Sequence, residues 1–330
     1  MLALRLASKN PLTALRRISP LRVVAAWKKS DASASDLLPV VLLGFLSNTF
    51  LVIGVLLSLG RRQGTPKIDP KRTIPTREET APSKKNVIDN YNREGKNYDN
   101  IRYGRTKGGR FFSEIELRKT LEMVRGEKVL HVGTATGRVS SYLVSKGFDY
   151  VGLELSKVMA RITKEKLEGA GDVVQGDAEH LPFKPSVFDD VVSVRSFHFL
   201  PHPDVFLTDA NRVLKQTGRV TVSFEKNVRG RETFRRVMRL PPSNAKRTYY
   251  GNPEVALLLR NAKFETLSVG NVTKLPLLFY WRMKNDGFLR KVHPRMPPLF
   301  GTVGVVVGSK RNSPQGSGIS IRTFGPSRVG

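Results

Sequence analysis

Two glycines and a carboxylate in the middle of the chain have the types and the spacing to hold a nucleotide-like ligand. Gly133 and Gly137 bracket the loop GTATG, which follows the apolar run KVLHV and precedes a helix expected to begin near Arg138. Glycine lets the backbone turn tightly and approach a ligand closely, and the first N–H groups of a helix attract an anion. Glu154 follows the loop at about the spacing of an acid that accepts hydrogen bonds from both hydroxyls of a ribose.

A second carboxylate, Asp177, stands in the segment GDAEHLPF. It is placed to accept a hydrogen bond from an exocyclic amine, while Ala178 and Leu181 offer an apolar slot for a flat ring. Because these features follow one another in order, we predict a pocket for a nucleoside-bearing cofactor.

Alternating elements must position these residues. Short β-branched runs, expected to be strands, alternate with stretches of helical character. This alternation predicts βαβ units and a parallel α/β sheet covered on both faces, with its ligand outside the carboxyl ends of the strands. The expected strands are 129–132, 150–155, 172–176, 189–194 and 219–224, and the expected helices are 137–147, 156–169 and 203–218.

Four segments carry a family resemblance: KVLHVGTATGRVSSYLVSKGFDYVGLELS, VVQGDAEHLPF, FDDVVSVRSFHFL and NRVLKQTGRVTVSF. They resemble the successive motifs of class I S-adenosylmethionine-dependent methyltransferases, within the ubiquinone/menaquinone-biosynthesis-type branch (methyltransferase domain 11). The resemblance covers about residues 86–224 and continues more loosely to GTVGVVVGSK. It implies a Rossmann-like, seven-stranded, mostly parallel sheet with helices on both faces, and S-adenosyl-L-methionine as the cofactor.

The resemblance also implies which residues bind the cofactor. The glycine loop would lie against the methionine part, the acid after the second strand would hold the ribose, and the GDAE segment would hold the adenine. An aromatic segment before the first strand would fold across the cofactor, although its rings equally suit packing against the sheet. The residues so implied are Gly133, Thr134, Ala135, Gly137, Glu154, Leu155, Asp177, Ala178, Arg195 and Tyr98.

The sequence departs from the family pattern at two positions. His131 stands where family members usually have an acid, and Ala135 where they usually have glycine. Alanine costs about 1 kcal/mol if the backbone there needs a positive φ. His131 removes a negative charge near a cationic sulfonium. Since Glu154 and Asp177 are intact, we expect cofactor binding to be retained.

The segment RSFHFLPHPD lines the acceptor side in this family. His198 is the leading candidate for a general base, with a purely structural histidine as the alternative. Arg195 is a candidate contact to the cofactor or to an acidic acceptor. The five histidines show no clustered spacing, so no metal is predicted.

Composition narrows the partners. The chain has 330 residues, no cysteine and a net charge of +28. The missing thiols exclude disulfides and a cysteine nucleophile. The charge predicts attraction to a polyanion, which is either nucleic acid or an anionic membrane surface.

The run 37–60 contains no charged residue. As a helix it would be roughly 36 Å long, enough to cross a hydrocarbon core of about 30 Å. We therefore predict a single transmembrane helix. Basic residues flank it on both sides, and their slight excess after it favours a cytoplasmic C-terminal domain. Residues 1–30 carry basic residues and no acid, which also suits a mitochondrial presequence, so the mitochondrial inner membrane is the alternative location.

The predicted organisation has five parts. They are a basic N-terminal segment (1–36), the transmembrane helix (37–60), a flexible linker (61–85), the methyltransferase domain (86–311, with a core at 126–225 and a basic insertion at 226–248) and a disordered tail (312–330).

Three functions remain open from the sequence. The first is a membrane-anchored methyltransferase acting on a small, lipophilic acceptor such as a quinone precursor or a lipid. The second is an RNA or other nucleic-acid methyltransferase. The net positive charge favours it, but the sequence lacks the Asn/Asp-Pro-Pro-aromatic motif of base-amino methylases after the fourth expected strand. The third is a non-catalytic protein of the same fold, motivated by the two departures in the glycine loop.

Overall fold

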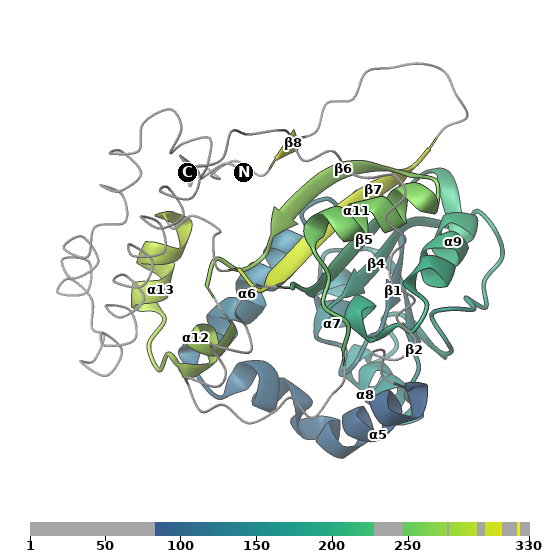
Figure 1. Cartoon of the computed structure of the whole chain (residues 1–330). Helices are drawn as coiled ribbons and strands as arrows, with labels where there is room; N and C mark the ends of the chain where they lie inside the picture. The colour runs from purple at the N-terminus through teal and green to yellow at the C-terminus, as the bar shows by residue number, and fades with distance from the viewer. Residues whose placement is uncertain (1–82, 228–246, 276, 296–300, 312–321, 324–330) are drawn as a thin grey trace, which may run out of the picture.

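The computed structural model describes residues 83–227, 247–275, 277–295, 301–311 and 322–323, which form a layered α/β fold around one mixed sheet (Figure 1). The strand order is β3-β2-β1-β4-β5-β7-β6-β8. The strands are β1 (Lys128–Val132), β2 (Asp149–Glu154), β3 (Asp172–Gln175), β4 (Phe188–Val194), β5 (Leu214–Glu225), β6 (Phe264–Asn271), β7 (Val303–Lys310) and β8 (Arg322–Thr323).

Strand direction confirms the prediction of a mostly parallel sheet. β3, β2, β1, β4 and β5 run parallel, and β7 is antiparallel to both β5 and β6. The expected seven strands are joined by an eighth, β8, which has two residues and pairs with β6. Since β1 and β4 are neighbours while β2 and β3 extend the other way, the chain reverses direction across the sheet at β1 and β4, where ligands of such sheets bind.

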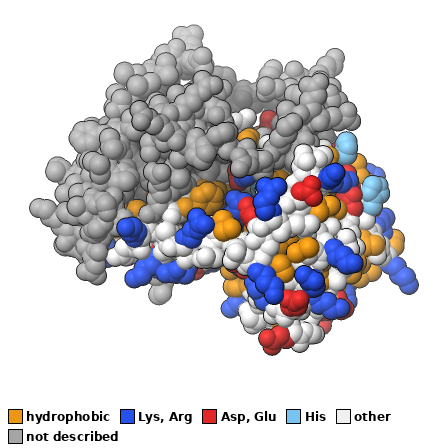
Figure 2. Space-filling model, turned by 90° about the horizontal axis from the view of Figure 1, so that it is seen from below, with side chains coloured by type: hydrophobic (Ala, Val, Ile, Leu, Met, Phe, Trp, Pro, Cys, Tyr) orange, Lys and Arg blue, Asp and Glu red, His pale blue; other side chains and the backbone are white. Residues whose placement is uncertain are grey.

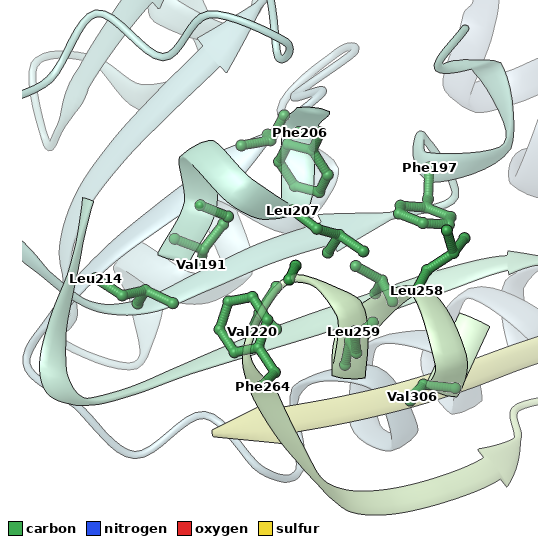
Figure 3. Close-up of a cluster of buried hydrophobic side chains, with 14 of the residues drawn as sticks. Val191, Phe197, Phe206, Leu207, Leu214, Val220, Leu258, Leu259, Phe264 and Val306 are labelled. Atoms are coloured by element: carbon green, nitrogen blue, oxygen red, sulfur yellow. The ribbon is translucent and has the colours of Figure 1, made fainter. Parts of the chain in front are cut away.

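Helices cover both faces of the sheet (Figure 1). Alternate residues of a strand point to opposite faces. Thus Leu130 and Val132 of β1 join the cluster under α9 (Pro203–Val213) and α11 (Asn252–Asn261), drawn in Figure 3, while Val129 joins the cluster under α7 (Arg138–Ser145). The helices are α5 (Lys84–Glu94), α6 (Lys107–Leu121), α7 (Arg138–Ser145), α8 (Lys157–Leu167), α9 (Pro203–Val213), α11 (Asn252–Asn261), α12 (Leu277–Arg282) and α13 (Gly287–Val292).

One expected helix is too long. The sequence stretch 203–218 was predicted to be helical throughout, but α9 ends at Val213 and β5 begins at Leu214. Leu214 has extended backbone angles and pairs with Phe188 of β4, and both side chains are fully buried. Pairing of two buried apolar side chains across the sheet therefore overrides the local helical pattern.

Short helical turns lead from α5 into α6. The turns η1 (Gly95–Asn97) and η2 (Asn100–Gly104) follow α5, and η3 (Phe197–Phe199) and η4 (His293–Arg295) occur later. Helix α5 begins at Lys84, with the Ser83 hydroxyl accepting from the N–H of Asn86 as its N-cap. We name residues 83–104 the covering segment.

Several predictions fall outside the described residues. These include the transmembrane helix at 37–60, the basic N-terminal segment and most of the basic insertion at 226–248. Within the ranges that the structure describes, no helix has the length and apolar character needed to cross a bilayer.

Candidate cofactor pocket

The floor of a pocket is formed by backbone at the ends of β1 and β4. Gly133 has φ +81°, and a Cβ added to it would lie 2.5 Å from Cβ of Ser196. The Ser196 hydroxyl donates to the carbonyl of Val132 at 2.8 Å, which fixes the two strand ends together. A side chain at position 133 would therefore collide with the adjoining loop, and only glycine fits.

Ala135 adopts a conformation that favours glycine. Its φ is +49°, so the alanine that replaces the usual family glycine does carry backbone strain of about 1 kcal/mol. The Ala135 N–H donates to Glu154 Oε2 at 2.8 Å. This hydrogen bond helps hold the loop in a conformation that alanine alone would not prefer.

Glu154 lies in the pocket wall at the carboxyl end of β2. Its Oε1 accepts from the N–H of Ser156 at 3.0 Å, in addition to the bond from Ala135. Burial raises the pKa of the Glu154 carboxyl above its usual value, and the backbone N–H groups of Ser156 and Ala135 oppose that rise. An acid here is therefore preorganised, with lone pairs left to accept from ligand hydroxyls.

Asp177 forms the next part of the wall, after β3. Its Oδ1 accepts from the N–H of Glu179 at 3.0 Å, and its Oδ2 accepts from Nζ of Lys84 at 2.5 Å. The same ammonium group donates to Glu179 Oε2 at 2.6 Å. Lys84 thus reaches from α5 across the pocket to the carboxylate that was expected to bind an amine.

The covering segment contacts the loops after four of the five parallel strands, β1 to β4. Besides Lys84, Asn92 accepts from the Ser156 hydroxyl at 2.6 Å after β2, and Asp99 accepts from the Thr136 hydroxyl at 2.5 Å after β1. The Tyr91 ring packs edge-on against Phe199 after β4, with centroids 5.7 Å apart. The segment therefore lies against the loops at this edge of the sheet and contributes Lys84, Val87, Tyr91 and Tyr98 to the lining of the pocket.

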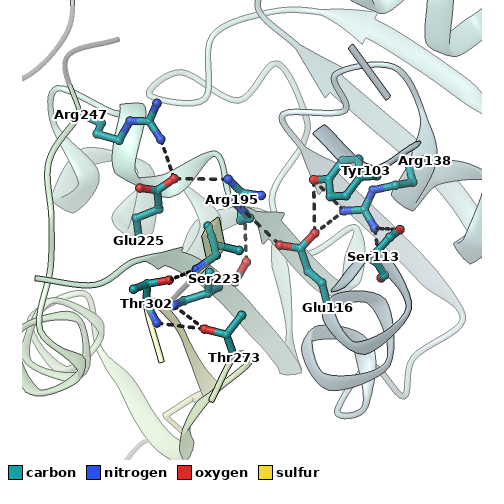
Figure 4. Close-up of polar contacts among 12 residues, drawn as sticks. Tyr103, Ser113, Glu116, Arg138, Arg195, Ser223, Glu225, Arg247, Thr273 and Thr302 are labelled. Atoms are coloured by element: carbon teal, nitrogen blue, oxygen red, sulfur yellow. Dashed lines mark hydrogen bonds and ion pairs between the residues drawn. The ribbon is translucent and has the colours of Figure 1, made fainter. Parts of the chain in front are cut away.

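A network of charged side chains borders the pocket at the end of β4 (Figure 4). Arg195 Nη2 donates to Glu225 Oε1 at 3.3 Å, and Arg247 Nη1 donates to the same oxygen at 2.5 Å. On the other side, Glu116 Oε2 accepts from Arg138 and from the Tyr103 hydroxyl. The guanidinium of Arg195 lies between these two carboxylates, and its Nε is 3.7 Å from Glu116 Oε1.

Most of the residues predicted to bind the cofactor line this pocket. They are Gly133, Ala135, Glu154, Leu155, Asp177, Ala178, Arg195 and Tyr98. Thr134 and Gly137 are not among its lining residues. The Thr134 hydroxyl instead forms a hydrogen bond of 3.1 Å with the Thr163 hydroxyl of α8, and Gly137 is the N-cap of α7.

The two histidines singled out in the sequence lie outside the lining. His198 is buried, and its ring packs against Phe199, whose own side chain does line the pocket. Its role as a base stays a prediction. His131 is buried in β1 beside Tyr150, and burial, aided by the charge of Arg138, lowers its pKa to about 3. It is therefore a neutral core residue and not a charge facing the ligand.

Sequence reasoning missed the residues that reach the pocket from elsewhere in the chain. Lys84 stood in the predicted linker, where no pattern marks it. Glu225 carried a recognisable signal, because it is an acid at the carboxyl end of an apolar strand. Glu116 lies on α6, and its buried face gives no hint of an ion pair with a residue far along the chain.

Comparison with known proteins shows what this part of the chain is similar to. Residues 130–222 match the family described as "Methyltransferase domain". The chain is 41% identical over 98 residues to the fatty-acid O-methyltransferase of Mycolicibacterium smegmatis, covering 29% of this chain and 36% of that protein. It is 38% identical over 96 residues to the phthiotriol/phenolphthiotriol dimycocerosates methyltransferase of Mycobacterium tuberculosis, covering 28% and 36%.

A solved structure also aligns over much of the chain. The 1,6-didemethyltoxoflavin-N1-methyltransferase of Burkholderia thailandensis, with bound S-adenosylhomocysteine, aligns with a TM-score of 0.46 and 17% identity, covering 69% of this chain and 88% of that one. The matched part of our chain spans about a third of the length of the curated relatives.

The matched family and the two curated relatives support a resemblance of this part of the chain to class I S-adenosylmethionine-dependent methyltransferases. S-adenosylmethionine is the cofactor of this class.

Proposed function

We propose that the chain transfers a methyl group from S-adenosylmethionine to a small, lipophilic acceptor. The observation that carries this proposal is the position of Glu154 and Asp177 at successive strand ends, in the wall of one pocket whose floor is backbone. The residues fit the cofactor. Glu154 would hold the ribose hydroxyls, Asp177 the adenine amine, and Leu155 and Ala178 the faces of the ring.

The residues of the chain contribute orientation and exclusion of water. When bound, S-adenosylmethionine supplies an electrophilic methyl group on a sulfonium, so that little beyond alignment is required of the protein. The hydrogen bond from Ala135 to Glu154 keeps the carboxylate in place before a ligand arrives. Tyr91 and Phe199, which line the pocket in edge-on contact, would limit the access of water to a bound cofactor.

A lipophilic acceptor is supported by the lining of the pocket and by the relatives. Apolar and aromatic side chains of Val87, Tyr91, Phe199 and Leu200 border it beside the polar groups. The two relatives described above are named for fatty-acid and phthiotriol substrates. On the described face that contains α5, Lys and Arg side chains are interspersed with hydrophobic and acidic ones, without one uniformly basic patch (Figure 2).

We also propose that the apolar run 37–60 anchors the chain in a membrane, with the methyltransferase domain on the cytoplasmic side. Anchoring would raise the local concentration of an acceptor that partitions into the bilayer. The mitochondrial inner membrane is the alternative location, on the strength of the basic, acid-free residues 1–30.

The test is a calorimetric titration of the full-length chain with S-adenosylhomocysteine, followed by incubation with methyl-labelled S-adenosylmethionine and a total lipid extract. We expect saturable one-to-one binding, and label in the organic phase. Absence of binding would contradict the proposal. A parallel incubation contains RNA as well as the lipid extract. Label in the RNA and not in the lipid would favour a nucleic-acid acceptor.

A further inference from the structure

A second cleft lies at the amino ends of β1 and β2, at the edge of the sheet opposite the candidate cofactor pocket. Its volume is about 490 Å³, and Arg125 and Phe148, which stand just before these two strands, belong to its lining. Helix α7 connects the two sites, since its N-cap Gly137 ends the glycine loop and its C-cap Lys146 lines the cleft. The eight residues of α7 span about 12 Å, and the two sites share no lining residue.

Positive charge dominates the lining, and we name this site the basic cleft. Four cations and one acid line it, namely Arg118, Lys119, Arg125 and Lys146 with Glu122. Glu122 Oε2 lies 3.7 Å from Nζ of Lys119. In the part of the chain that the structure describes, the other three cations take part in no ion pair. The C-terminal ends of α6 and α7 bring about half a negative charge each, so that about two positive charges remain in the lining.

Neighbouring groups respond to this charge. Burial, together with the charge of Lys119, lowers the pKa of Lys274 to about 8. Burial lowers the pKa of His293 to about 3, and the charges of Lys274 and of the two cations on α6, Arg118 and Lys119, lower it further. The field of the cations at the end of α6 therefore reaches beyond the lining.

Apolar side chains form the rest of the basic cleft. They are Leu121, Tyr142 and Phe148, of which Leu121 is buried and the two rings are half-buried against the core cluster under α7. The ammonium group of Lys146 lies 5.6 Å from the centre of the Tyr142 ring. Charge and apolar surface thus stand side by side, and a ligand that uses both is an anion with an apolar body.

We propose that the basic cleft binds the phosphate group of a phosphate monoester that carries an apolar body. Such a phosphate brings a charge of about −1.5 to −2 and three acceptor oxygens, which match the surplus charge better than a single carboxylate does. The guanidinium groups of Arg118 and Arg125 would donate pairs of hydrogen bonds, and Lys146 would add a point charge.

This inference goes beyond the proposed methyltransferase function and does not depend on it. A ligand at the amino ends of the strands lies away from the pocket at their carboxyl ends, so it is not the methyl acceptor. The same chemistry has two sources, a soluble phosphate ester or the headgroup of a lipid such as phosphatidic acid, and the experiment separates them.

The first measurement is calorimetry on the full-length chain with phenyl phosphate, inorganic phosphate and phenol. We expect phenyl phosphate to bind about tenfold or more tightly than either of the others, because only it combines the charge with an apolar ring. If phenyl phosphate binds no more tightly than inorganic phosphate or phenol, the inference is wrong. This comparison requires no substitution.

Variants locate the bound phosphate. The double variant Arg118→Met/Arg125→Met should lower the affinity for phenyl phosphate about tenfold or more, because two charge-assisted donors are lost. The matched control is Arg161→Met/Arg260→Met, which removes the same charge from exposed positions on α8 and α11 and should keep the unaltered affinity. Equal affinities in the two double variants would overturn the inference, since the anion would then respond only to the net charge of the chain.

Flotation with phosphatidylcholine vesicles, with and without phosphatidic acid, identifies the source. If phosphatidic acid increases vesicle binding of the control variant but not of Arg118→Met/Arg125→Met, the ligand is a lipid headgroup. If it acts equally on both variants while phenyl phosphate still distinguishes them, the ligand is a soluble phosphate ester. Both results support a phosphate site in the basic cleft.

Discussion

Oε2 of Glu154 accepts a 2.8 Å hydrogen bond from the N–H of Ala135, which ties the end of β2 to the loop after β1. One carboxylate therefore shapes the glycine loop and also faces the pocket. This acid therefore supports the glycine loop, in addition to the ribose binding that we propose for it.

Glu154→Gln weakens both duties. The single amide oxygen of glutamine can accept from Ala135 or from Ser156 but not from both, and its NH2 group then faces the other N–H, so the free energy of unfolding should fall by about 1–3 kcal/mol. The loss of charge should lower affinity for S-adenosylhomocysteine by about tenfold or more, since hydrogen bonds to a charged acceptor are the stronger ones. Calorimetry measures this loss. Glu165→Gln, at an exposed position on α8, is the control, and equal affinity in both variants would show that the ribose site lies elsewhere.

Ala135→Gly should stabilise the protein. Glycine relieves the positive φ at this position, and we expect a gain of about 1 kcal/mol in the free energy of unfolding in urea. The same substitution at Ala256, inside α11, should cost about 1 kcal/mol because glycine is unfavourable in a helix. A loss of stability at both positions would argue against the left-handed conformation of the loop.

Lys84→Met should speed the binding of S-adenosylhomocysteine. Lys84 occupies Asp177 Oδ2, so its ammonium group must leave before an adenine amine can take that oxygen. Because the ion pair is partly exposed, we expect the association rate to rise about two- to fivefold, measured by surface plasmon resonance. Lys85→Met, one residue along α5 and exposed, should bind at the unaltered rate. A slower rate in Lys84→Met would mean that this lysine assists the ligand.

His131 should make the protein acid-sensitive. Burial lowers its pKa from an ordinary value of 6.5 to about 3, so below pH 6.5 the unfolded chain binds a proton that the folded chain does not. Stability is therefore lost as the pH falls from 6.5 towards 3. Between pH 7 and pH 5 this residue alone should cost about 2 kcal/mol.

The measurement is the free energy of unfolding of His131→Asn at both pH values. Between pH 7 and pH 5, the free energy of unfolding of His131→Asn should fall by about 2 kcal/mol less than that of the unaltered protein. His180→Asn, at an exposed position, should keep the full drop. Parallel pH profiles for all three proteins would show that His131 is protonated to the same extent in both states.

The sequence predicted the parts of the pocket that local pattern controls. Glu154 and Asp177 were found because each follows a β-branched run, and the ends of parallel strands meet at one edge of the sheet. The boundary of α9 was missed because Leu214 is held by a partner, Phe188, that local propensity cannot report.

Contacts between distant positions were not predictable. Lys84 and Asp177 are 93 residues apart, and nothing in either segment specifies the other. Thr134 was expected to face the ligand, yet its hydroxyl turns towards Thr163. The sequence of a loop indicates its backbone turn, whereas the packed neighbours decide which side chains face inwards.

The backbone floor at Gly133 and Ser196 has an implication for how such a protein diversifies. A floor built from main-chain atoms tolerates almost no substitution at Gly133. Under the function that we propose, recognition of the methyl donor would therefore depend on the course of the chain. Tyr91, Phe199 and Leu200 line the same pocket with side chains that can be exchanged one at a time. Under the same proposal, altering these three side chains would change the acceptor while the donor site is inherited intact.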